Sequence, residues 1–363
     1  MLGLACLNRT GVQVSTTTDA APSTTARARR PGTAALGAGL ALLALLLCAA
    51  TALSLTVGSG QVSLHDVLHG VFTPDSAVRG QLVVHQVRLP RTLAGLLAGV
   101  ALGLAGAVIQ GLTRNPLADP GLLGVNAGAA VSVVFAISVL SLTEPGQYIW
   151  FGFLGACLAA VLVYGVGSLG REGATPVKLA LAGAATTAVL SSVTSAMLLT
   201  DSRTFDQFRF WQVGALNGRD IDVLRQALPF VVIGVVLAQA LGPRLNGLAL
   251  GDDVARGLGQ RLGVTRLCAA LCVVLLCGAA TAVAGPLGFV GLAVPHAARL
   301  LTGPDHRWLL PYSALLAPVL LLLADVLGRV VAPPGEVQVG VVTAAVGSVP
   351  FVLLVRRSAR GAL

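Results

Sequence analysis

Charged residues are scarce in this chain of 363 residues, since Asp, Glu, Lys and Arg together make up 11% of it. A soluble globular protein carries about 25%, so the polar surface is too small to cover a soluble body. Hydrophobic residues make up 55%, and 44 glycines add to them. A membrane bundle needs polar surface only at its two ends, and each span needs about 20 apolar residues. The composition argues against two soluble domains and indicates an all-α membrane protein.

Lysine and catalytic motifs are also nearly absent. The only lysine, Lys178, stands in TPVKL without a preceding glycine, so the chain has no GxxxxGK[ST] loop to cradle the phosphates of ATP. No nucleophile–base signature stands out, and we do not expect the chain to be an enzyme. The net charge of +9 comes from arginines at the edges of apolar runs. This placement indicates membrane topology and not nucleic-acid binding.

The cysteines and histidines, which could act as metal ligands, do not have the spacing that is typical of a metal site. Five of the six cysteines lie inside apolar runs, where cysteine acts as a small core hydrophobe. Cys268 and Cys272 are one helical turn apart but have no partner ligand nearby. His65 and His69 stand four residues apart, and no acid or cysteine joins them at zinc-like spacing. We expect no metal or other cofactor, and we interpret the two histidines as part of an amphipathic surface helix.

Ten charge-poor apolar runs predict ten transmembrane helices. Residues 1–33 are rich in Ser, Thr, Ala and Arg, which is typical of a disordered cytosolic leader. The transmembrane domain is predicted over 34–356, followed by a cytosolic tail, 357–363. The ten runs are 36–57, 92–113, 121–142, 148–169, 178–200, 228–243, 267–285, 287–302, 309–328 and 339–355.

The distribution of positive charge predicts the orientation. If the first helix starts inside, the inner segments carry twice as many Lys and Arg residues as the outer segments. Cytoplasmic loops of membrane proteins carry such an excess. We therefore expect a multi-pass protein of the cytoplasmic membrane with both termini in the cytosol.

Small residues predict how the helices pack. Gly95, Gly99 and Gly103 are four residues apart, with Gly106 close behind. A helical face of small residues lets backbones approach each other in lipid, where no hydrophobic drive pairs helices. We expect this glycine face to contact a neighbouring helix closely.

A weak internal repeat also exists. The dipeptide that ends in Gly106 precedes Pro116 by the same distance as the dipeptide that ends in Gly285 precedes Pro295. The offset between the two copies spans five helices. An odd number of helices inverts the topology, as in many transporter repeats.

The first polar island, RNPLADPGLLG, covers 114–124. Its two prolines and an asparagine predict a fixed, non-helical turn between two helices. An ordinary tight loop between helices explains the same spacing equally well.

The second polar island covers 245–266 on the predicted inner side. Gly251 ends one short segment, and Asp252 or Asp253 can cap the next one. The pattern predicts a pair of short cytosolic helices that suits docking into a partner's groove; a solvated loop is the alternative. The apolar residues of the pair are Leu248, Leu250, Val254 and Leu258.

The third polar island covers 285–307, where Pro295 and His296 interrupt a short span and Asp305-His306-Arg307 forms a charged inner corner. We interpret His296 as a hydrogen-bonded structural histidine, with a ligand-path or proton-relay role as the alternative.

Asp325 is the clearest ionisable residue within a span. An acid at the centre of a span costs about 2.5–3.5 kcal/mol on insertion scales. Arg329 stands one turn further on, and pairing between the two offsets part of that cost. We therefore favour a structural ion pair over a proton relay.

These motifs resemble the FecCD-type permeases, the membrane subunits of ABC importers for ferric siderophores, haem and vitamin B12. The run RLPRTLAGLLAGVALGLAGAVIQGLTRNPLADPGLLGVNAGAA is similar to the family's second and third spans. FRFWQVGALNGRD resembles the segment before the sixth span, and LALGDDVARGLG resembles the coupling helices. GPLGFVGLAVPHAARLLTGPDHRWLLPYSALL and ADVLGRVV resemble the C-terminal third. The similarity covers about 36–356. Pro318 and the segment VAPPGEVQVG depart from the family's usual sequence pattern.

The resemblance implies a BtuC-like fold of about ten helices with inverted five-helix repeats. It also implies a dimer of permeases, two ATP-binding cassette ATPase subunits and a substrate-binding lipoprotein outside. Similarity to one permease of two-permease siderophore systems favours a heterodimer with a sister permease over a homodimer.

The resemblance and the polar islands together select the candidate site residues. The ATPase-coupling residues are Gly251, Asp252, Asp253, Arg256, Leu258 and Gly259. The cytosolic-corner residues are Pro295, His296, Arg299, Asp305, His306 and Arg307. The pathway candidates are Gln110, Asn115, Asn126 and Thr343, and the candidates for docking the binding protein are Arg79 and Arg88.

The resemblance thus predicts the permease subunit of an importer that moves an iron(III)–siderophore complex across the cytoplasmic membrane. A cobalamin or haem importer of the same family is one alternative. An ion-coupled secondary transporter is another, but it requires ion ligands at the membrane midplane, for which Asp325 alone is thin support. A non-transporting sensor or scaffold is the third.

Overall fold

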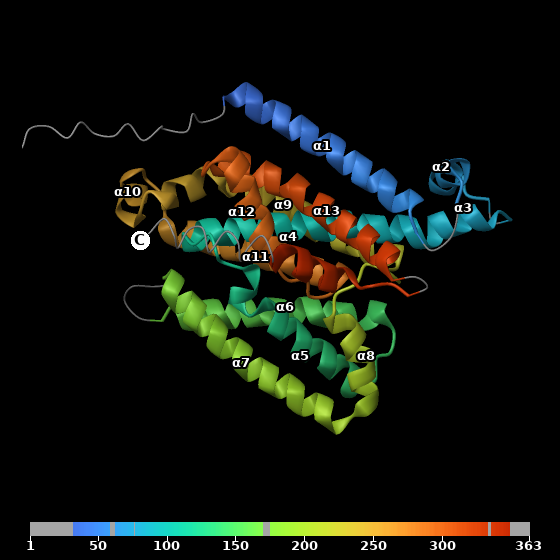
Figure 1. Ribbon diagram of the computed structural model, residues 1–363. Coiled ribbons are helices and arrows are strands. Elements are labelled where there is room, and N and C mark those ends of the chain that lie inside the picture. The colour runs from blue at the N-terminus through green and yellow to red at the C-terminus, as the bar shows by residue number, and fades with distance from the viewer. Residues whose placement is uncertain (1–31, 59–61, 76, 170–174, 333–334, 349–363) are drawn as a thin grey trace, which may run out of the picture. The chain divides into compact units, whose positions relative to one another are not determined.

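The computed structural model describes residues 32–58, 62–75, 77–169, 175–332 and 335–348. Within these residues the regular elements are all helices (Figure 1). The predicted leader, apart from its last two residues, and the predicted tail lie outside the described residues. In chain order the elements are α1 (Thr33–Thr56), α2 (Leu64–Phe72), α3 (Arg79–Val83), a π-helical turn (Val84–Arg88), α4 (Leu89–Thr113), a 3₁₀ turn (Pro120–Leu123), α5 (Val125–Ser138), α6 (Pro145–Gly167), α7 (Pro176–Thr200), α8 (Ser202–Gln212), α9 (Ile221–Ala249), α10 (Asp252–Gly257), α11 (Leu262–Ala284), α12 (Val290–Thr302), α13 (His306–Val331) and a last helix, Val339–Ser348.

Seven of the described helices are long and apolar enough to cross a membrane, namely α1, the continuous helix Arg79–Thr113, α6, α7, α9, α11 and α13. Helix α5 and the last helix are apolar but shorter. Helix α12 has 13 residues, which extend about 20 Å against a hydrocarbon core of about 30 Å. Each of the ten predicted runs contains a helix, but helix length does not establish ten complete crossings.

The helix that contains α4 begins earlier than predicted, at Arg79 instead of residue 92. Arg88 and Arg91 look like the polar end of an apolar run in the sequence. In the structure the two residues are only 4% and 7% exposed, and other parts of the bundle accept their hydrogen bonds. The helix therefore continues through both arginines.

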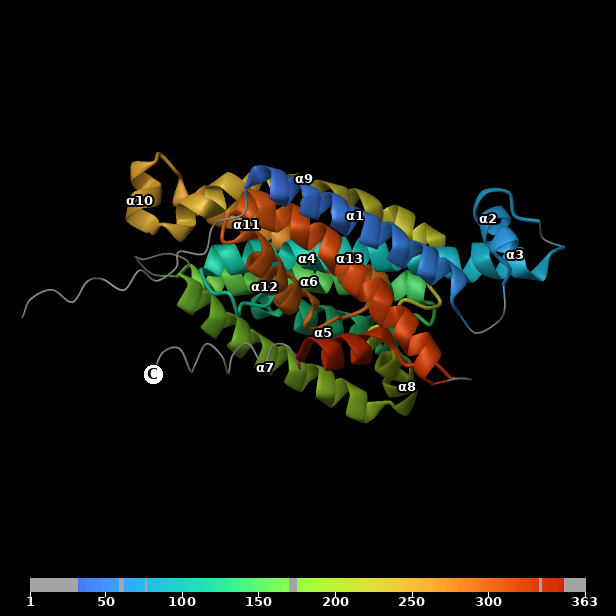
Figure 2. The same cartoon turned by 45° about the horizontal axis from the view of Figure 1, so that its top comes forward.

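Helices α4 and α11 are central, since most of each is buried inside the bundle. Helix α4 packs against α13, α11, α9 and α12, while α5 packs against α6 and α7. Figure 1 shows these as two groups of helices, with α5, α6, α7 and α8 forming the second group; in the turned view of Figure 2 the two groups overlap. Contacts between α6 and α11 join the groups.

The predicted glycine face of α4 is confirmed. A Cβ atom at Gly99 would lie 2.6 Å from the backbone nitrogen of Pro318, and one at Gly103 would lie 2.6 Å from Cβ of Ala317. Such distances leave no room for a side chain, so α4 and α13 approach at backbone distance. Pro318 departs from the family pattern, and it is accommodated because it faces a glycine.

The two copies of the weak repeat are not structurally equivalent. Gly106 lies in the interior of α4 and Pro116 in the loop that follows, whereas Gly285 ends α11 and Pro295 lies inside α12. Gly285 ends α11 with φ 76° and ψ −176°, a backbone conformation that is essentially restricted to glycine. The two similar sequence segments therefore have different secondary structures, and they give no support to inverted repeats.

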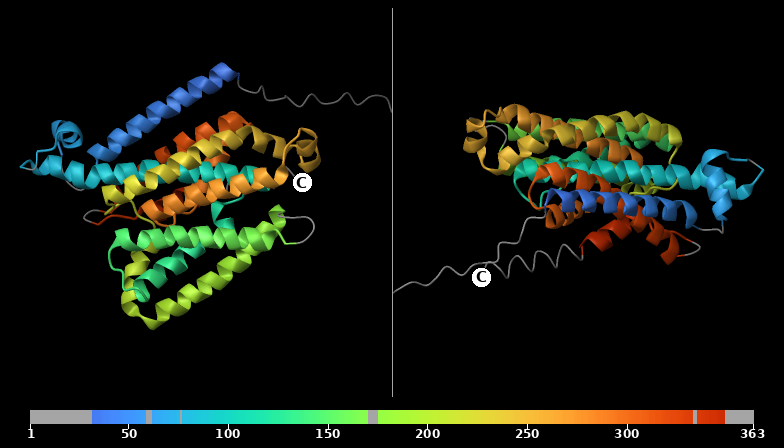
Figure 3. Two further views of the ribbon diagram at one scale, coloured as in Figure 1. Left: turned by 180° about the vertical axis from the view of Figure 1, so that it is seen from behind. Right: turned by 90° about the horizontal axis from the view of Figure 1, so that it is seen from above.

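Helix α10 lies at one end of the bundle, and α2 and α3 lie at the other (Figures 1 and 3). We call these the α10 end and the α2 end. Helix α9 has 29 residues, about 44 Å at 1.5 Å per residue, and it begins near the α2 end and leads into α10. The two ends are therefore far enough apart to lie on opposite sides of a membrane.

Candidate functional site

Helix α10 is a single short helix held between two glycines. Gly251 precedes it with a φ of 104°, and Gly259 follows it with a φ of 79°; both values favour glycine. The predicted pair of short helices is wrong, because the segment up to Ala249 continues α9. Leu248 is 2% exposed, and its burial in the core holds that segment in the long helix.

Asp252 joins three elements instead of capping α10 with its side chain. Its Oδ1 accepts a hydrogen bond from Nη2 of Arg114 at 3.0 Å, and its Oδ2 accepts one from Nη2 of Arg266 at 2.6 Å. Arg114 directly follows α4, and Arg266 lies near the start of α11. Partly exposed ion pairs contribute about 1 kcal/mol or less each, so their main effect is to connect α10 with both central helices.

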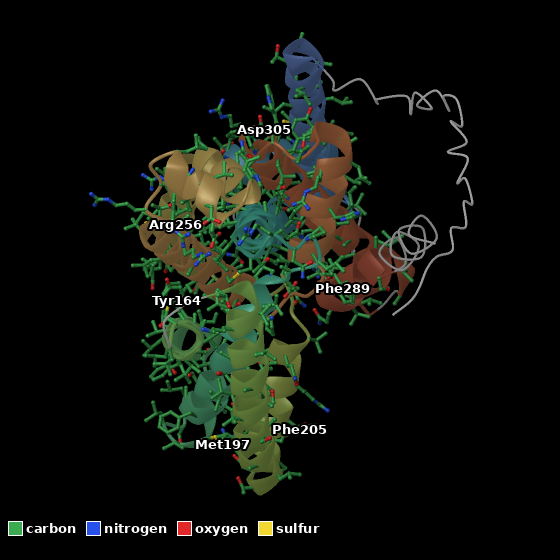
Figure 4. The ribbon with its side chains drawn as sticks, turned by 90° about the vertical axis from the view of Figure 1, so that its left-hand side faces the viewer. Tyr164, Met197, Phe205, Arg256, Phe289 and Asp305 are labelled. Carbon is green, nitrogen blue, oxygen red and sulfur yellow. The ribbon has the colours of Figure 1, made fainter. Side chains whose placement is uncertain are left out.

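The tip of the α10 segment presents apolar side chains to its surroundings. Leu250, Val254 and Leu258 are 64%, 49% and 64% exposed. Beside them, Asp253 and Arg256 form a surface ion pair at 2.9 Å, and Figure 4 looks onto this end of the bundle with Arg256 labelled on α10. An exposed apolar patch rimmed by charges is typical of a protein interaction site.

Asn246, Asp305 and His306 form a hydrogen-bonded cluster where α9 meets the start of α13. Nδ2 of Asn246 donates to Asp305 at 2.6 Å, while its Oδ1 accepts from the backbone N–H and the ring Nδ1 of His306, each at 2.9 Å. In the neutral ring Nδ1 therefore carries the proton, and Nε2 is an acceptor. Sequence motifs indicated Asp305 and His306 but gave no signal for Asn246.

The carboxylate of Asp305 is stabilised in its charged form. It accepts from the backbone N–H of Arg307 and so caps α13. Burial raises the pKa of Asp305, but the hydrogen bonds from Arg307 and Asn246 outweigh it, and the pKa is lowered overall.

A cavity of about 210 Å³ lies beside this cluster, lined by Gln110, Arg299 and His306 among others. Nη2 of Arg299 donates to Oε1 of Gln110 at 3.2 Å, and Nε2 of Gln110 donates to the carbonyl of Leu292 at 3.2 Å. Nε2 of His306 is buried and has no hydrogen-bond partner within the described part of the chain. The structure thus brings together one predicted pathway residue and two residues of the predicted corner.

The other predicted residues of these two sets do not line this cavity. Asn115 is exposed in the loop after α4, Asn126 is partly buried in α5, and Thr343 is buried in the last helix. Pro295 and His296 lie within α12. Nδ1 of His296 is buried without a hydrogen-bond partner among the described residues, so the bond expected of a structural histidine is missing there.

The two docking candidates differ in position. Arg79 is exposed at the start of α3. Arg88 is 4% exposed, and its Nη1 donates to the backbone carbonyls of Leu55 at 2.9 Å and Thr56 at 2.7 Å. This burial contradicts the surface position that docking requires, and Arg88 instead satisfies carbonyls at the end of α1.

A buried ionic cluster at the α2 end was predicted only in part. The expected pair of Asp325 and Arg329 is present at 2.9 Å. Arg91 also binds Asp325, through Nε at 2.9 Å and Nη2 at 2.8 Å, and binds Glu336 at 2.7 Å. Arg329 further donates to the carbonyl of Ser54 at 2.9 Å. The cluster connects α1, α4, α13 and the segment before the last helix, and most of these partners are too far apart in sequence for local patterns to pair them.

Metal ligands do not gather in the described residues. No group of three or more His, Cys, Asp or Glu side chains in this part of the chain is placed to hold a metal ion. His65 and His69 lie side by side on α2, with ring centroids 4.3 Å apart.

The described residues form a helical bundle in which seven helices are long and apolar enough to cross a membrane, with an exposed segment around α10 at one end. This architecture is that of a multi-span membrane protein. Comparison with known proteins agrees. The model of the FecCD transport family matches residues 44–357. The chain therefore belongs to the FecCD transport family, and the resemblance to this family is confirmed.

Two relatives match almost their whole length. The chain is 42% identical over 321 residues to the "Probable siderophore transport system permease protein YfiZ" of Bacillus subtilis, covering 88% of this chain and 96% of that protein. It is 47% identical over 319 residues to the ferric enterobactin transport system permease protein FepD of Escherichia coli, covering 88% and 95%.

A solved structure shares the fold. It is described as "An inward-facing conformation of a putative metal-chelate type ABC transporter", and it matches with a TM-score of 0.77 and 27% identity, covering 88% of this chain and 99% of that chain.

Proposed function

We propose that this chain is the permease subunit of an ABC importer that carries a ferric siderophore across the cytoplasmic membrane. The observation that carries the proposal is the family match over residues 44–357. Relatives named for siderophore and enterobactin transport match over 96% and 95% of their lengths, so the likeness concerns the complete membrane subunit. ATP hydrolysis belongs to separate ATPase subunits, since the chain has no Walker A loop.

The α10 segment is the contact with an ATPase subunit. Leu250, Val254 and Leu258 are exposed and fit an apolar groove on that partner. Movement of the groove pulls α10, and the ion pairs of Asp252 with Arg114 and Arg266 pass the movement to α4 and α11. Central helices that shift together open the bundle to one face or the other.

The α10 end faces the cytosol in this proposal, and both termini lie there. The excess of Lys and Arg in the loops on that side supports this orientation. The α2 end then faces outward, where the exposed Arg79 on α3 is placed to pair with an acidic residue of a substrate-binding lipoprotein.

In this proposal the pathway for the chelate lies between this chain and a sister permease. The cavity that contains Gln110, Arg299 and His306 lies at the cytosolic exit. Asn115, Asn126 and Thr343 remain candidates for the wall of the pathway, and a heterodimer remains the favoured assembly.

Two alternatives make different predictions. A cobalamin or haem importer of the same family would show the same ATP dependence with another ligand. An ion-coupled transporter needs a titratable acid that can exchange its ion, but Asp325 is bound by both Arg91 and Arg329. This engagement favours a structural role for the acid.

The proposal is tested by comparing ligand uptake in a strain that lacks the gene for this chain with uptake in the same strain carrying the wild-type gene. The ligands are ⁵⁵Fe-labelled catecholate, hydroxamate and carboxylate siderophores, ⁵⁵Fe-labelled haem and cobalt-labelled cobalamin. We expect uptake of at least one ferric siderophore, and it should stop when ATP is depleted. Uptake that survives ATP depletion but collapses with an uncoupler would show an ion-coupled transporter instead.

The coupling role is tested by changing Leu250, Val254 and Leu258 together to serine. These side chains are exposed, so the chain should insert and fold normally while uptake falls at least about tenfold. The matched control is Leu199→Ser, because Leu199 is also exposed on α7 but lies away from α10. Normal uptake by the triple variant would refute the coupling role.

A further inference from the structure

Two adjoining cavities at the α2 end share the side chain of Arg219. The inner cavity, of about 190 Å³, is lined by Tyr148, Gln207, Trp211 and Gln338 among others. The outer cavity, of about 600 Å³, lies beside the starts of α4 and α9. We call the pair of cavities the Arg219 site.

The guanidinium of Arg219 has unused hydrogen-bonding capacity. Its Nε and Nη2 donate to the carbonyl of Ala215 at 3.2 and 3.1 Å, which occupies one edge of the group. Within the described residues no carboxylate lies in ion-pair range of it. The edge formed by Nη1 and Nη2 remains, and this edge suits two parallel bonds to a carboxylate.

A second, independent observation lies in the wall of the inner cavity. Trp211 is only 3% exposed, and its Nε1 has no hydrogen-bond partner among the described residues. Oε1 of Gln207 is also buried without a hydrogen-bond partner there. A buried donor or acceptor without a hydrogen-bond partner destabilises the folded protein, so a ligand that supplies the missing bond is favoured. The wall therefore holds an unpaired indole N–H next to an arginine without an anion.

The nearby acids are engaged or exposed, so they do not satisfy Arg219. Asp220 caps α9 by accepting from the backbone N–H of Asp222. Asp222 itself pairs with Arg225 at 3.4 Å on the surface. Glu144 is exposed and lies in electrostatic range of Tyr148. Burial lowers the pKa of Arg219, but arginine remains charged in proteins.

Size restricts what can enter. A volume of about 190 Å³ equals roughly six water molecules at about 30 Å³ each, which admits one arm of a ligand but not a whole chelate. The outer cavity of about 600 Å³ lies within the range of small-molecule sites. An arm in the inner cavity and the ligand body in the outer cavity fit both volumes.

We propose that the Arg219 site binds a carboxylate-bearing arm of the transported chelate, with Arg219 pairing with the carboxylate and Trp211 donating its indole N–H. The identity of the ligand as the transported chelate rests on the proposed function, while carboxylate binding itself does not. The proposal narrows the substrate to ferric chelates that carry free carboxylates.

The test is equilibrium dialysis of [¹⁴C]citrate, without iron, against the full-length chain in lipid nanodiscs. We expect saturable binding that weakens at least about tenfold in Arg219→Gln, because the paired charge is lost. The matched control is Arg203→Gln, because Arg203 is exposed on α8 and lines neither cavity; this variant should bind citrate within about twofold of the wild type. Absence of saturable binding to the wild-type chain, or equal binding by Arg219→Gln, overturns the proposal.

A second variant guards against misfolding of Arg219→Gln. Trp211→Phe keeps the aromatic ring but removes the N–H donor, and it should weaken citrate binding about threefold or more; unchanged binding would overturn the role of Trp211.

In cells, Arg219→Gln should lower uptake of ferric citrate more than uptake of a ferric hydroxamate without carboxylates. Equal loss of both would assign the citrate site to something other than the transported chelate. Citrate binding without any ferric uptake would count against the importer and not against the site.

Discussion

Replacement of Asp325 by asparagine removes the negative charge at the centre of the buried ionic cluster. The residue is 1% exposed and binds Arg91 and Arg329. Asparagine keeps one acceptor oxygen but loses the charge, so the two guanidinium groups remain buried with Glu336 as the acid still bound to Arg91.

The expected cost follows from the bonds that are lost. Hydrogen bonds to charged groups contribute about 1.5–3 kcal/mol each, and asparagine can replace about half of those that Asp325 accepts. Removing one partner of a buried ion pair costs about 3–5 kcal/mol in measured cases. Both routes predict about 3–5 kcal/mol for Asp325→Asn. At about 2 °C per kcal/mol for a chain of this size, the midpoint of thermal unfolding should fall by roughly 6–10 °C.

The assay is thermal unfolding in detergent, followed by a fluorescent reagent that labels thiols as they become exposed. Cys272 and Cys277 are buried and report the opening of the central helix α11. The matched control is Asp222→Asn, because Asp222 also pairs with an arginine but both side chains are exposed. Such a pair contributes about 0–1 kcal/mol, so the midpoint should move by less than about 2 °C. If Asp325→Asn shifts the midpoint no further than this control, the cluster adds no net stability and the reasoning is wrong.

Two further substitutions probe packing and capping. Gly99→Leu should abolish correctly folded protein, because a side chain there meets the backbone of Pro318, whereas Gly37→Leu has nothing within 4 Å and should be tolerated; size-exclusion chromatography of the detergent-extracted protein decides, and a normal profile for Gly99→Leu would contradict the packing. The lowered pKa of Asp305 means that its stabilising effect is present above the unfolded pKa of about 3.9 and is lost as the pH falls through the folded value. Asp305→Asn should therefore lower the unfolding midpoint at pH 7 and have less effect below pH 4, measured by thermal unfolding across pH; an equal effect at both pH values would contradict the sign.

Much of the fold could be predicted from local patterns. Each apolar run contains a helix because backbone groups in lipid must be satisfied within the segment. The spacing of Gly99 and Gly103 predicted a close contact because residues four apart share a helical face. The pairing of Asp325 with Arg329 could be predicted for the same reason.

The partners that are distant in sequence could not be predicted. Arg91 looks like the polar boundary of a span, and its bond to Asp325 crosses 234 residues. Arg88 looks like a surface residue for the same reason, although its partners are carbonyls at the end of α1. Asn246 carries no motif, yet it fixes the tautomer of His306. In each case the signal depends on which helices are neighbours, and local sequence does not contain that information.

Ion pairs hold helix α4 at both ends. Arg91 in its first turn binds Asp325 on α13, and Arg114, directly after its last residue, binds Asp252 on α10. Between these anchors α4 has 25 residues, about 38 Å, and its glycine face leaves no space for sliding against α13. In the proposed importer, a pull on α10 is passed to α4 through the pair of Arg114 and Asp252. We expect α4 and α13 to move as one rigid unit, so that a displacement at the α10 end reaches the cluster around Asp325 at the α2 end.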